Sequence, residues 1–217
     1  MSGRIVVLNG APRSGKSSIA ASMQAGLSGN WINLGVDAIN RTLPPSLRPG
    51  IGLRPGGERP DLEPALPALY LALYDSIAAH ARLGFDVVAD LGHHDGYSSP
   101  LGILPACAQR MAGLDVLFVG VMCDLDTIMA RRNADPQDGF YASGEGVPPP
   151  VQRWQDAVHV PGIYDLRVDT AVMTSAECAE AIADALAVPP RIRAFEQLAL
   201  DSSISAPVPS GPADGRA

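Results

Sequence analysis

The stretch "GAPRSGKSS", residues 10–18, decides the fold of this 217-residue chain. Its fixed positions match the pattern G-x-x-x-x-G-K-[ST], the phosphate-binding P-loop. The two glycines permit a tight bend in which several backbone N–H groups converge on one anion. The alternative is an ordinary strand–helix turn that carries an exposed lysine, and the sequence on either side decides between the two.

The flanking residues place the loop between a strand and a helix. "RIVVLN" (4–9) is a short apolar run typical of a buried strand, and 17–27 has apolar residues at helical spacing. A helix N-terminus adds unpaired N–H groups and partial positive charge. We therefore predict a nucleoside triphosphate site, in which Lys16 reaches the β- and γ-phosphates and Ser17 binds Mg²⁺. The predicted cofactor-binding residues are Gly10, Ala11, Pro12, Arg13, Ser14, Gly15, Lys16, Ser17 and Ser18.

Strand and helix patterns alternate along the rest of the chain. The expected strands are 4–9, 31–37, 85–90, 115–124 and 164–170. The expected helices are 17–27, 38–43, 65–83, 99–112, 125–133, 151–159 and 175–187. This order predicts an α/β fold of the P-loop kinase type, a three-layer α/β/α sandwich with a five-stranded parallel sheet.

Two segments rich in Pro and Gly interrupt this pattern. Residues 44–67 are predicted to run over the surface without a regular helix or sheet ladder. A second such segment lies within a predicted lid, around 131–155. We expect residues 1–188 to form one kinase domain that includes this lid. Residues 189–217 are expected to be an extension with a short helix and a disordered tail.

Composition and charge restrict the partners and the compartment. A net charge of −7 argues against a general nucleic-acid or membrane-surface binder. No apolar run reaches the roughly 18 residues of a membrane span, and the first ten residues lack the features of a signal peptide. Three scattered cysteines without metal-type spacing are expected to be reduced thiols. The predicted location is the cytoplasm.

Acidic residues at the ends of strands are the candidates for chemistry. The second strand ends in "GVD", so Asp37 lies at the carboxyl edge, where open α/β sheets bind ligands. A carboxylate there would align an attacking hydroxyl, although Asp37 is also a candidate helix N-cap. Asp90, after the third strand, is placed to bind Mg²⁺ through water or to contact an acceptor; a turn or cap role is the alternative. His93 is expected beside the acceptor pocket.

The chain resembles the chloramphenicol phosphotransferase family, small P-loop kinases, from about residue 4 to 187. The resemblance lies in "IVVLNGAPRSGKSSI" (5–19), "WINLGVDAI" (31–39), "LDVLFVGVMCD" (114–124), "VHVPGIYDLRVDT" (158–170) and "SAECAEAIA" (175–183). It implies an ATP- and Mg²⁺-dependent O-phosphotransferase that phosphorylates a small-molecule hydroxyl, as in the inactivation of an antibiotic such as chloramphenicol. It also implies that Asp37 is the base for that hydroxyl. Arg131 matches an arginine of the family and would stabilise the transferring phosphoryl group, together with Lys16.

The departures from the family all border the acceptor side. They are "LGHHDGYSSP" (91–100), the lid segment 133–150 and the segment 44–67. The acceptor, the preference for ATP over GTP and the oligomeric state, a homo-oligomer included, therefore stay open. A metabolite kinase of the same fold and a non-catalytic nucleotide-binding switch are the alternative functions.

Overall fold

The computed structural model describes residues 2–135, 146–188 and 193–200. In this part of the chain, five parallel strands pair in the order β2-β3-β1-β4-β5. They are β1 (Ile5–Asn9), β2 (Trp31–Asn33), β3 (Asp86–Leu91), β4 (Val116–Met122) and β5 (Leu166–Asp169). The predicted five-stranded parallel sheet is confirmed.

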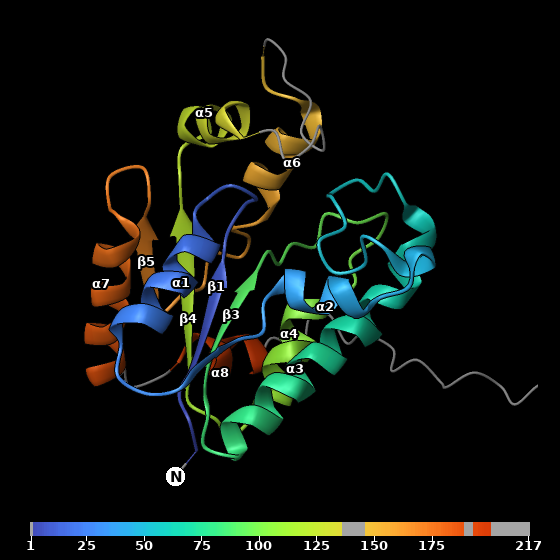
Figure 1. Cartoon of the computed structure of the whole chain (residues 1–217). Helices are drawn as coiled ribbons and strands as arrows, with labels where there is room; N and C mark the ends of the chain where they lie inside the picture. Colours follow the sequence, from blue (N-terminus) through green and yellow to red (C-terminus); the bar gives the residue numbers. More distant parts are fainter. Residues whose placement is uncertain (1, 136–145, 189–192, 201–217) are drawn as a thin grey trace, which may run out of the picture.

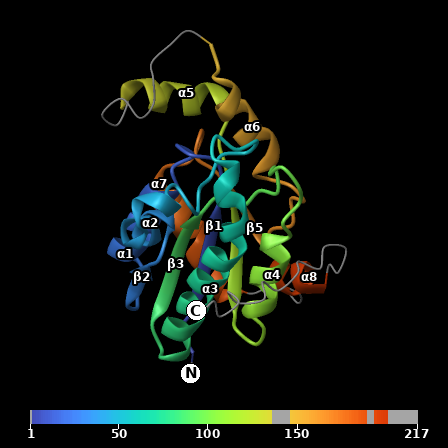
Figure 2. The ribbon, with the colours of Figure 1, turned by 90° about the vertical axis from the view of Figure 1, so that its right-hand side faces the viewer.

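The central strand β1 is buried along its whole length, and its side chains alternate between two cores. Ile5 and Val7 face α3 (Leu66–Arg82), α4 (Ile103–Arg110) and α8 (Ala194–Leu200). Val6 and Leu8 face α1 (Lys16–Gly26) and α7 (Ser175–Ala187) on the other side. Figures 1 and 2 show the helices covering both faces, which confirms the three-layer sandwich.

Three further helices lie at the carboxyl edge of the sheet. They are α2 (Val36–Thr42), α5 (Leu125–Ala134) and α6 (Pro149–Ala157). Figure 1 shows α5 and α6 above the strand ends, with α2 beside β3. The predicted lid includes residues 136–145, which lie outside the described residues.

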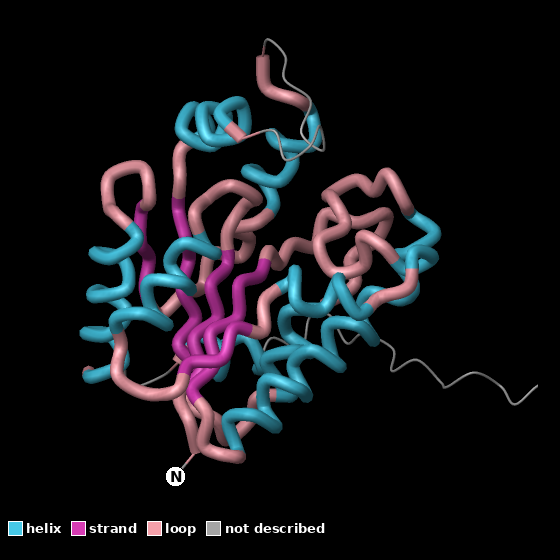
Figure 3. Tube along the Cα trace, in the orientation of Figure 1, coloured by secondary structure: helices cyan, strands magenta, loops and turns pink. Residues whose placement is uncertain are grey.

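The Pro/Gly-rich segment 44–67 differs from the predicted surface excursion. It contains two 3₁₀ helices, η1 (Pro45–Leu47) and η2 (Pro60–Ala65), and forms the loops beside α2 in Figure 3. Ile51, Leu53 and Leu62 are buried in the same core as α3. Proline suits the short turns of a 3₁₀ helix, and the apolar residues between the glycines then pack inward. The segment is part of the core and forms one wall beside the strand ends.

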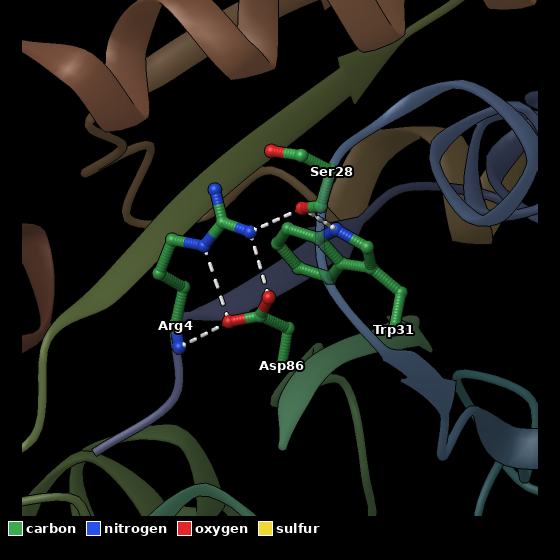
Figure 4. Close-up of polar contacts among 4 residues, drawn as sticks. All are labelled: Arg4, Ser28, Trp31 and Asp86. Carbon is green, nitrogen blue, oxygen red and sulfur yellow. Dashed lines mark hydrogen bonds and ion pairs between the residues drawn. The ribbon is translucent and has the colours of Figure 1, made fainter. Parts of the chain in front are cut away.

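The amino ends of β1, β2 and β3 are held by a compact polar cluster (Figure 4). The Arg4 Nη2 lies 2.6 Å from Asp86 Oδ2, and the Arg4 backbone N–H also donates to this carboxylate. The same guanidinium donates to the Ser28 carbonyl and lies 4.9 Å from the centre of the Trp31 ring. Burial opposes ionisation of Asp86, but the Arg4 hydrogen bonds and charge leave its pKa below the usual value. The cluster fixes the edge of the sheet opposite the strand ends that carry the P-loop.

The described part of the predicted extension packs on the sheet. Helix α8 buries Phe195 and Leu198 against the core on the α3 and α4 side. The Asp165 carboxylate joins α8 to β4, since it accepts hydrogen bonds from the backbone N–H groups of Ala194 and Phe118. The tail predicted to be disordered, 201–217, lies outside the described residues. Among the helices that the structure describes, none has the length and apolar character to span a bilayer.

Candidate active site

A cleft of about 820 Å³ opens at the carboxyl edge of the sheet, around the P-loop. The P-loop, the start of α2, the end of β3, α5 and the segment after β5 all contribute to it. Its polar and charged lining residues include Arg13, Lys16, Ser17, Ser18, Asp37, Asn40, Asp90, Arg131, Thr170, Thr174 and Ser175.

Two glycines are required by the course of the P-loop. A Cβ on Gly10 would lie 2.6 Å from the Val121 carbonyl oxygen, so the loop approaches β4 too closely for any side chain. Gly15, just before α1, has a φ of 90° in the left-handed region. The result is the bent backbone that the motif predicts, between β1 and α1.

Lys16 is buried at the base of the loop. Its Nζ donates to the Ala11 carbonyl at 2.8 Å, so the side chain folds back over the loop. Burial lowers the pKa of Lys16, and the nearby carboxylates of Asp90 and Asp37 oppose that shift. Burial thus makes the positive charge of Lys16 unfavourable in the empty cleft. A bound polyanion would stabilise that charge, so the position is suited to bind one.

The side chains of Ser17 and Asp90, both of which line the cleft, contact each other. The Ser17 hydroxyl donates to the Asp90 carboxylate, which β3 brings alongside Leu8 of β1. Hydroxyl and carboxylate oxygens are ligands that suit Mg²⁺, and phosphate oxygens and water complete such sites. No cluster of three His, Cys, Asp or Glu side chains that could hold a metal occurs in the part of the chain that the structure describes. The oxygens of the Ser17–Asp90 pair are of the type that suits Mg²⁺.

Asp37 is exposed and lines the same cleft as Lys16. It is the second residue of α2, whose N-cap is Gly35, and no side-chain cap is present. The alternative that Asp37 caps this helix is therefore wrong. Its carboxylate makes no hydrogen bond to another residue in the described ranges.

The guanidinium of Arg131 bridges the P-loop and the segment after β5. Its Nη1 donates to the Arg13 carbonyl at 3.2 Å and to Thr170 Oγ1 at 3.1 Å, and its Nη2 donates to the Thr170 carbonyl at 2.6 Å. The Thr170 hydroxyl in turn donates to the Ser14 carbonyl. Arg131 thus lies beside the P-loop, whereas its neighbour Arg132 is buried and faces a second, smaller cavity.

His93 does not reach the cleft. It is 3 % exposed, lines neither cavity, and its Nε2 lies 2.8 Å from the Tyr74 hydroxyl. Burial, with a smaller contribution from His94, lowers the pKa of His93 to about 3. Its backbone N–H donates to the Asn9 side chain, so the loop after β3 is anchored to the end of β1. His93 thus packs beneath the cleft, where its contacts with Asn9 and Tyr74 join the loop after β3 to the end of β1 and to α3.

The pattern H-x-x-G-x-Y-D, residues 159–165, forms a block with a structural explanation. The Asn9 Nδ2 donates to both the Val158 carbonyl and the Tyr164 hydroxyl, and His159 Nδ1 lies 2.8 Å from that hydroxyl. These contacts tie the end of α6 to β1. The block is scaffolding for the strand that leads into the P-loop.

Some lining residues are absent from the sequence prediction. They include Trp154 of α6, which packs in one cluster with Ala11 of the P-loop, and the Ile51–Gly52 turn. Trp154 lies in the helix that the sequence predicts over 151–159. Its place in the cleft depends on packing between distant segments, which the sequence pattern does not give. The Thr174–Ser175 pair at the start of α7 also lines the cleft.

Comparisons with known proteins identify the family of the chain. The family described as "Chloramphenicol phosphotransferase-like protein" matches residues 3–187. The Mycobacterium tuberculosis protein named "Putative O-phosphotransferase Rv2636" is 25 % identical over 213 residues, which cover 90 % of this chain and 88 % of that protein.

Solved structures show the same fold. A Mycobacterium tuberculosis APS kinase, CysC, in complex with AMPPNP and APS has a TM-score of 0.57 and 22 % identity, with 86 % of this chain and 98 % of that chain covered. A tunicamycin resistance protein from Deinococcus radiodurans has a TM-score of 0.59 and 17 % identity, over 85 % and 95 % of the two chains. The fold is that of P-loop kinases, and the chain belongs to the chloramphenicol phosphotransferase-like family.

Proposed function

We propose that the chain is an O-phosphotransferase that transfers the γ-phosphoryl group of ATP to a hydroxyl group of a small molecule. The observation that carries this proposal is that Lys16, the Ser17–Asp90 pair and Asp37 line one cleft. A phosphate-binding loop and a carboxylate without a structural partner are the two halves of a phosphoryl-transfer site.

The P-loop, residues 10–18, would bind the donor. Its backbone N–H groups and the N-terminus of α1 would hold the phosphates, and Lys16 would neutralise the β- and γ-phosphate oxygens. Ser17 and Asp90 are the residues that would hold Mg²⁺, directly and through water. The ion, when bound, neutralises charge on the phosphates.

Asp37 would orient the acceptor and take its proton. The hydroxyl oxygen attacks the γ-phosphorus, the bond from that phosphorus to the β–γ bridging oxygen breaks, and ADP leaves with the bond's electron pair. The hydroxyl proton passes to the Asp37 carboxylate. Such a step depends on positioning and charge neutralisation, and a carboxylate within hydrogen-bond reach supplies the first.

Arg131 would stabilise charge on the transferring group. Its guanidinium is already held beside the P-loop by the carbonyls of Arg13 and Thr170. This arrangement supports a preorganised cation, which acts at less cost than one that must be ordered during the reaction.

The acceptor we propose to test first is an antibiotic alcohol such as chloramphenicol, because the family carries its name. The similarity in fold to a tunicamycin resistance protein is compatible with antibiotic inactivation. We place the reaction in the cytoplasm, since ATP is its donor and Cys107, Cys123 and Cys178 are buried free thiols.

Mass spectrometry tests the proposal directly. Purified protein with ATP and Mg²⁺ is offered chloramphenicol, other hydroxyl-bearing antibiotics, nucleosides and sugars, and each compound is examined for an added phosphoryl group. We expect one class to be modified by the native protein and not by the Lys16→Ala variant. If only a metabolite is phosphorylated, that metabolite and not an antibiotic is the acceptor. Nucleotide-dependent partner binding without any transfer would indicate a switch.

A further inference from the structure

The turn at residues 50–53 contributes to the lining of the cleft. Ile51 and Gly52 line it, and the turn is closed by a hydrogen bond from the Leu53 N–H to the Gly50 carbonyl at 3.0 Å. Gly50 and Gly52 both have a positive φ, of 48° and 102°. Glycines give an unfolded or loosely held segment many alternative conformations, so contacts from other elements are needed to hold this turn in one place.

Asn40 of α2 holds the turn by one of its carbonyls. The Asn40 Nδ2 donates to the Ile51 carbonyl at 2.9 Å. Asn40 lines the cleft, as does Asp37, and the two residues are one helical turn apart on α2. A Cβ on Gly52 would lie 3.4 Å from Val36 Cγ1, so the turn also lies against the start of this helix. The turn is therefore tied to the helix that carries the proposed base.

A second side chain, His94 from the loop after β3, holds the turn by another carbonyl. The His94 Nδ1 accepts a hydrogen bond from the Gly96 N–H at 3.1 Å, so the ring proton is on Nε2. That Nε2 donates to the Leu53 carbonyl at 2.9 Å. The His94 ring also lies 4.7 Å from the ring of Trp154, edge to face. His94 thus joins the turn to a second residue that lines the cleft.

The amide of Asn40 is only half satisfied. Its Nδ2 has the Ile51 carbonyl as a partner, whereas its Oδ1 is buried and makes no hydrogen bond within the described part of the chain. A buried oxygen without a partner costs free energy, which offsets much of what the Nδ2 hydrogen bond contributes. Stability alone therefore does not favour an asparagine at this position. The property that the amide supplies is the placement of the turn.

The start of α2 is held by the sheet independently of the turn. The Leu34 N–H donates to the Val88 carbonyl of β3 at 3.0 Å, and the Gly35 N–H donates to the Asn33 side chain at 2.9 Å. Asp37 should therefore keep its place when the turn is loosened. Loss of the contacts from Asn40 or His94 would change the shape of the cleft and leave the proposed base where it is.

We propose that Asn40 and His94 are positioning residues, which hold the turn 50–53 in the place where it fits the acceptor beside Asp37. The inference rests on the proposed function, because it concerns the acceptor of that reaction. A turn that is fixed before the acceptor arrives does not have to be ordered on binding, so the acceptor binds more tightly. Asn40 and His94 act through the turn, and no contact with the reacting atoms is assigned to them.

Kinetics of variants with similar shape test the proposal. Asn40→Leu removes the amide, and His94→Phe keeps a ring and removes its nitrogen atoms. The acceptor is the compound that the native protein phosphorylates in the mass-spectrometric screen, with chloramphenicol tried first. In both variants we expect the KM for the acceptor to rise at least about tenfold, with kcat and the KM for ATP within about twofold of the native values.

Two further variants serve as rescue and control. In His94→Gln the amide nitrogen can still donate to the Leu53 carbonyl, so most of the native KM for the acceptor should be recovered. Arg41→Gln, an exposed change next to Asn40, is the matched control and should leave every constant unchanged. A KM that rises equally in His94→Gln and His94→Phe would mean that the hydrogen bond to the turn is not what matters, and would overturn the role of His94.

Hydrogen–deuterium exchange tests the contacts without any substrate. We expect the peptide that covers residues 49–54 to exchange at least about tenfold faster in Asn40→Leu and His94→Phe than in the native protein, because the turn opens more often. Peptides from β1 and α1 should exchange as in the native protein, which shows that a variant is folded. If one variant unfolds, the other decides. Unfolding of both would mean that the contacts serve stability, and would overturn the proposal.

The remaining outcomes separate this inference from the proposed function. Unchanged exchange at 49–54, or faster exchange with a native KM for the acceptor, overturns the positioning role and leaves the proposed function standing. If the native protein phosphorylates none of the compounds, the proposed function falls and the positioning role falls with it.

Discussion

The Ser17 hydroxyl, at the start of α1, donates a hydrogen bond to the Asp90 carboxylate, at the end of β3. The contact spans 73 residues of sequence and joins the P-loop to the neighbouring strand. The parallel pairing of β1 and β3 places the two oxygens side by side, because both strands end at the same edge. The fold therefore brings together the two groups that we assign to Mg²⁺.

Replacing Asp90 is expected to weaken the use of Mg²⁺. In Asp90→Asn the Ser17 hydroxyl keeps a partner, but the negative charge beside the ion is lost. We expect the Mg²⁺ concentration for half-maximal phosphoryl transfer to rise about 10- to 100-fold, as for other outer-shell ligands. A Mg²⁺ titration of activity at saturating ATP measures this, and an unchanged midpoint would remove Asp90 from the site.

Replacing Asp37 is expected to affect turnover and spare nucleotide binding. Asp37→Asn keeps the shape of the side chain but cannot accept the hydroxyl proton. We expect kcat to fall at least about 10²-fold, in the range for a general base, with the Kd for AMPPNP unchanged. Arg41→Gln, an exposed change on the same helix α2, is the control and should match the native kcat. Equal kcat in native protein and Asp37→Asn would exclude Asp37 as the base.

Lys16→Met is expected to separate stability from function. Burial lowers the pKa of Lys16, so its charge is held at a cost in the nucleotide-free protein. Methionine fills a similar volume without that cost, and we expect the free energy of unfolding to rise by ~1 kcal/mol while ATP binding is lost. Urea unfolding without nucleotide and titration with AMPPNP measure the two effects. A large loss of stability would mean that the lysine is part of the scaffold.

The ion pair at the opposite edge of the sheet is expected to contribute to stability only. Asp86→Asn leaves the Arg4 guanidinium with a weaker acceptor, and we expect a loss of about 1–3 kcal/mol in the free energy of unfolding. Because Asp86 has a lowered pKa in the folded state, its contribution is present above the unfolded pKa and disappears as the pH falls through the folded pKa. Urea unfolding at neutral and acidic pH measures both.

The exposed pair Arg59–Asp61 is the control for that experiment. Asp61→Asn should leave the unfolding midpoint unchanged, because water already solvates both partners. A kcat changed by Asp86→Asn would contradict a purely structural role for the Arg4–Asp86 pair.

The strands and the P-loop were predictable because their signals are local. An apolar run, a glycine and a helix pattern in succession fix β1, the loop and α1 without reference to the rest of the chain. Strand two shows the limit of such signals, since 31–37 was predicted and β2 ends at Asn33. The Asn33 side chain accepts a hydrogen bond from the Gly35 backbone and turns the chain into α2. That turn places Asp37 inside the helix instead of at its cap.

Contacts between distant segments could not be predicted in the same way. The packing of Ile51 and Leu53 into the core, the burial of His93 and the bridge from Arg131 to Thr170 each depend on side chains far apart in sequence. Arg13 illustrates the point within the P-loop itself. Its type and position were visible, but the positive φ and the neighbouring arginines of the second cavity follow only from the folded chain.

His93 is expected to make the fold sensitive to acid. Its pKa of about 3 in the folded protein lies well below about 6.5 in an unfolded chain, so unfolding takes up a proton between these values. Stability should therefore fall as the pH falls from 6.5 toward 3, by up to about 1.4 kcal/mol per pH unit from this residue. In His93→Gln, whose amide can still reach the Tyr74 hydroxyl, the loss between pH 7 and pH 5 should be about 2 kcal/mol smaller than in the native protein. Urea unfolding of both proteins at the two pH values measures the difference. Equal losses would mean that His93 does not stay neutral in the folded core.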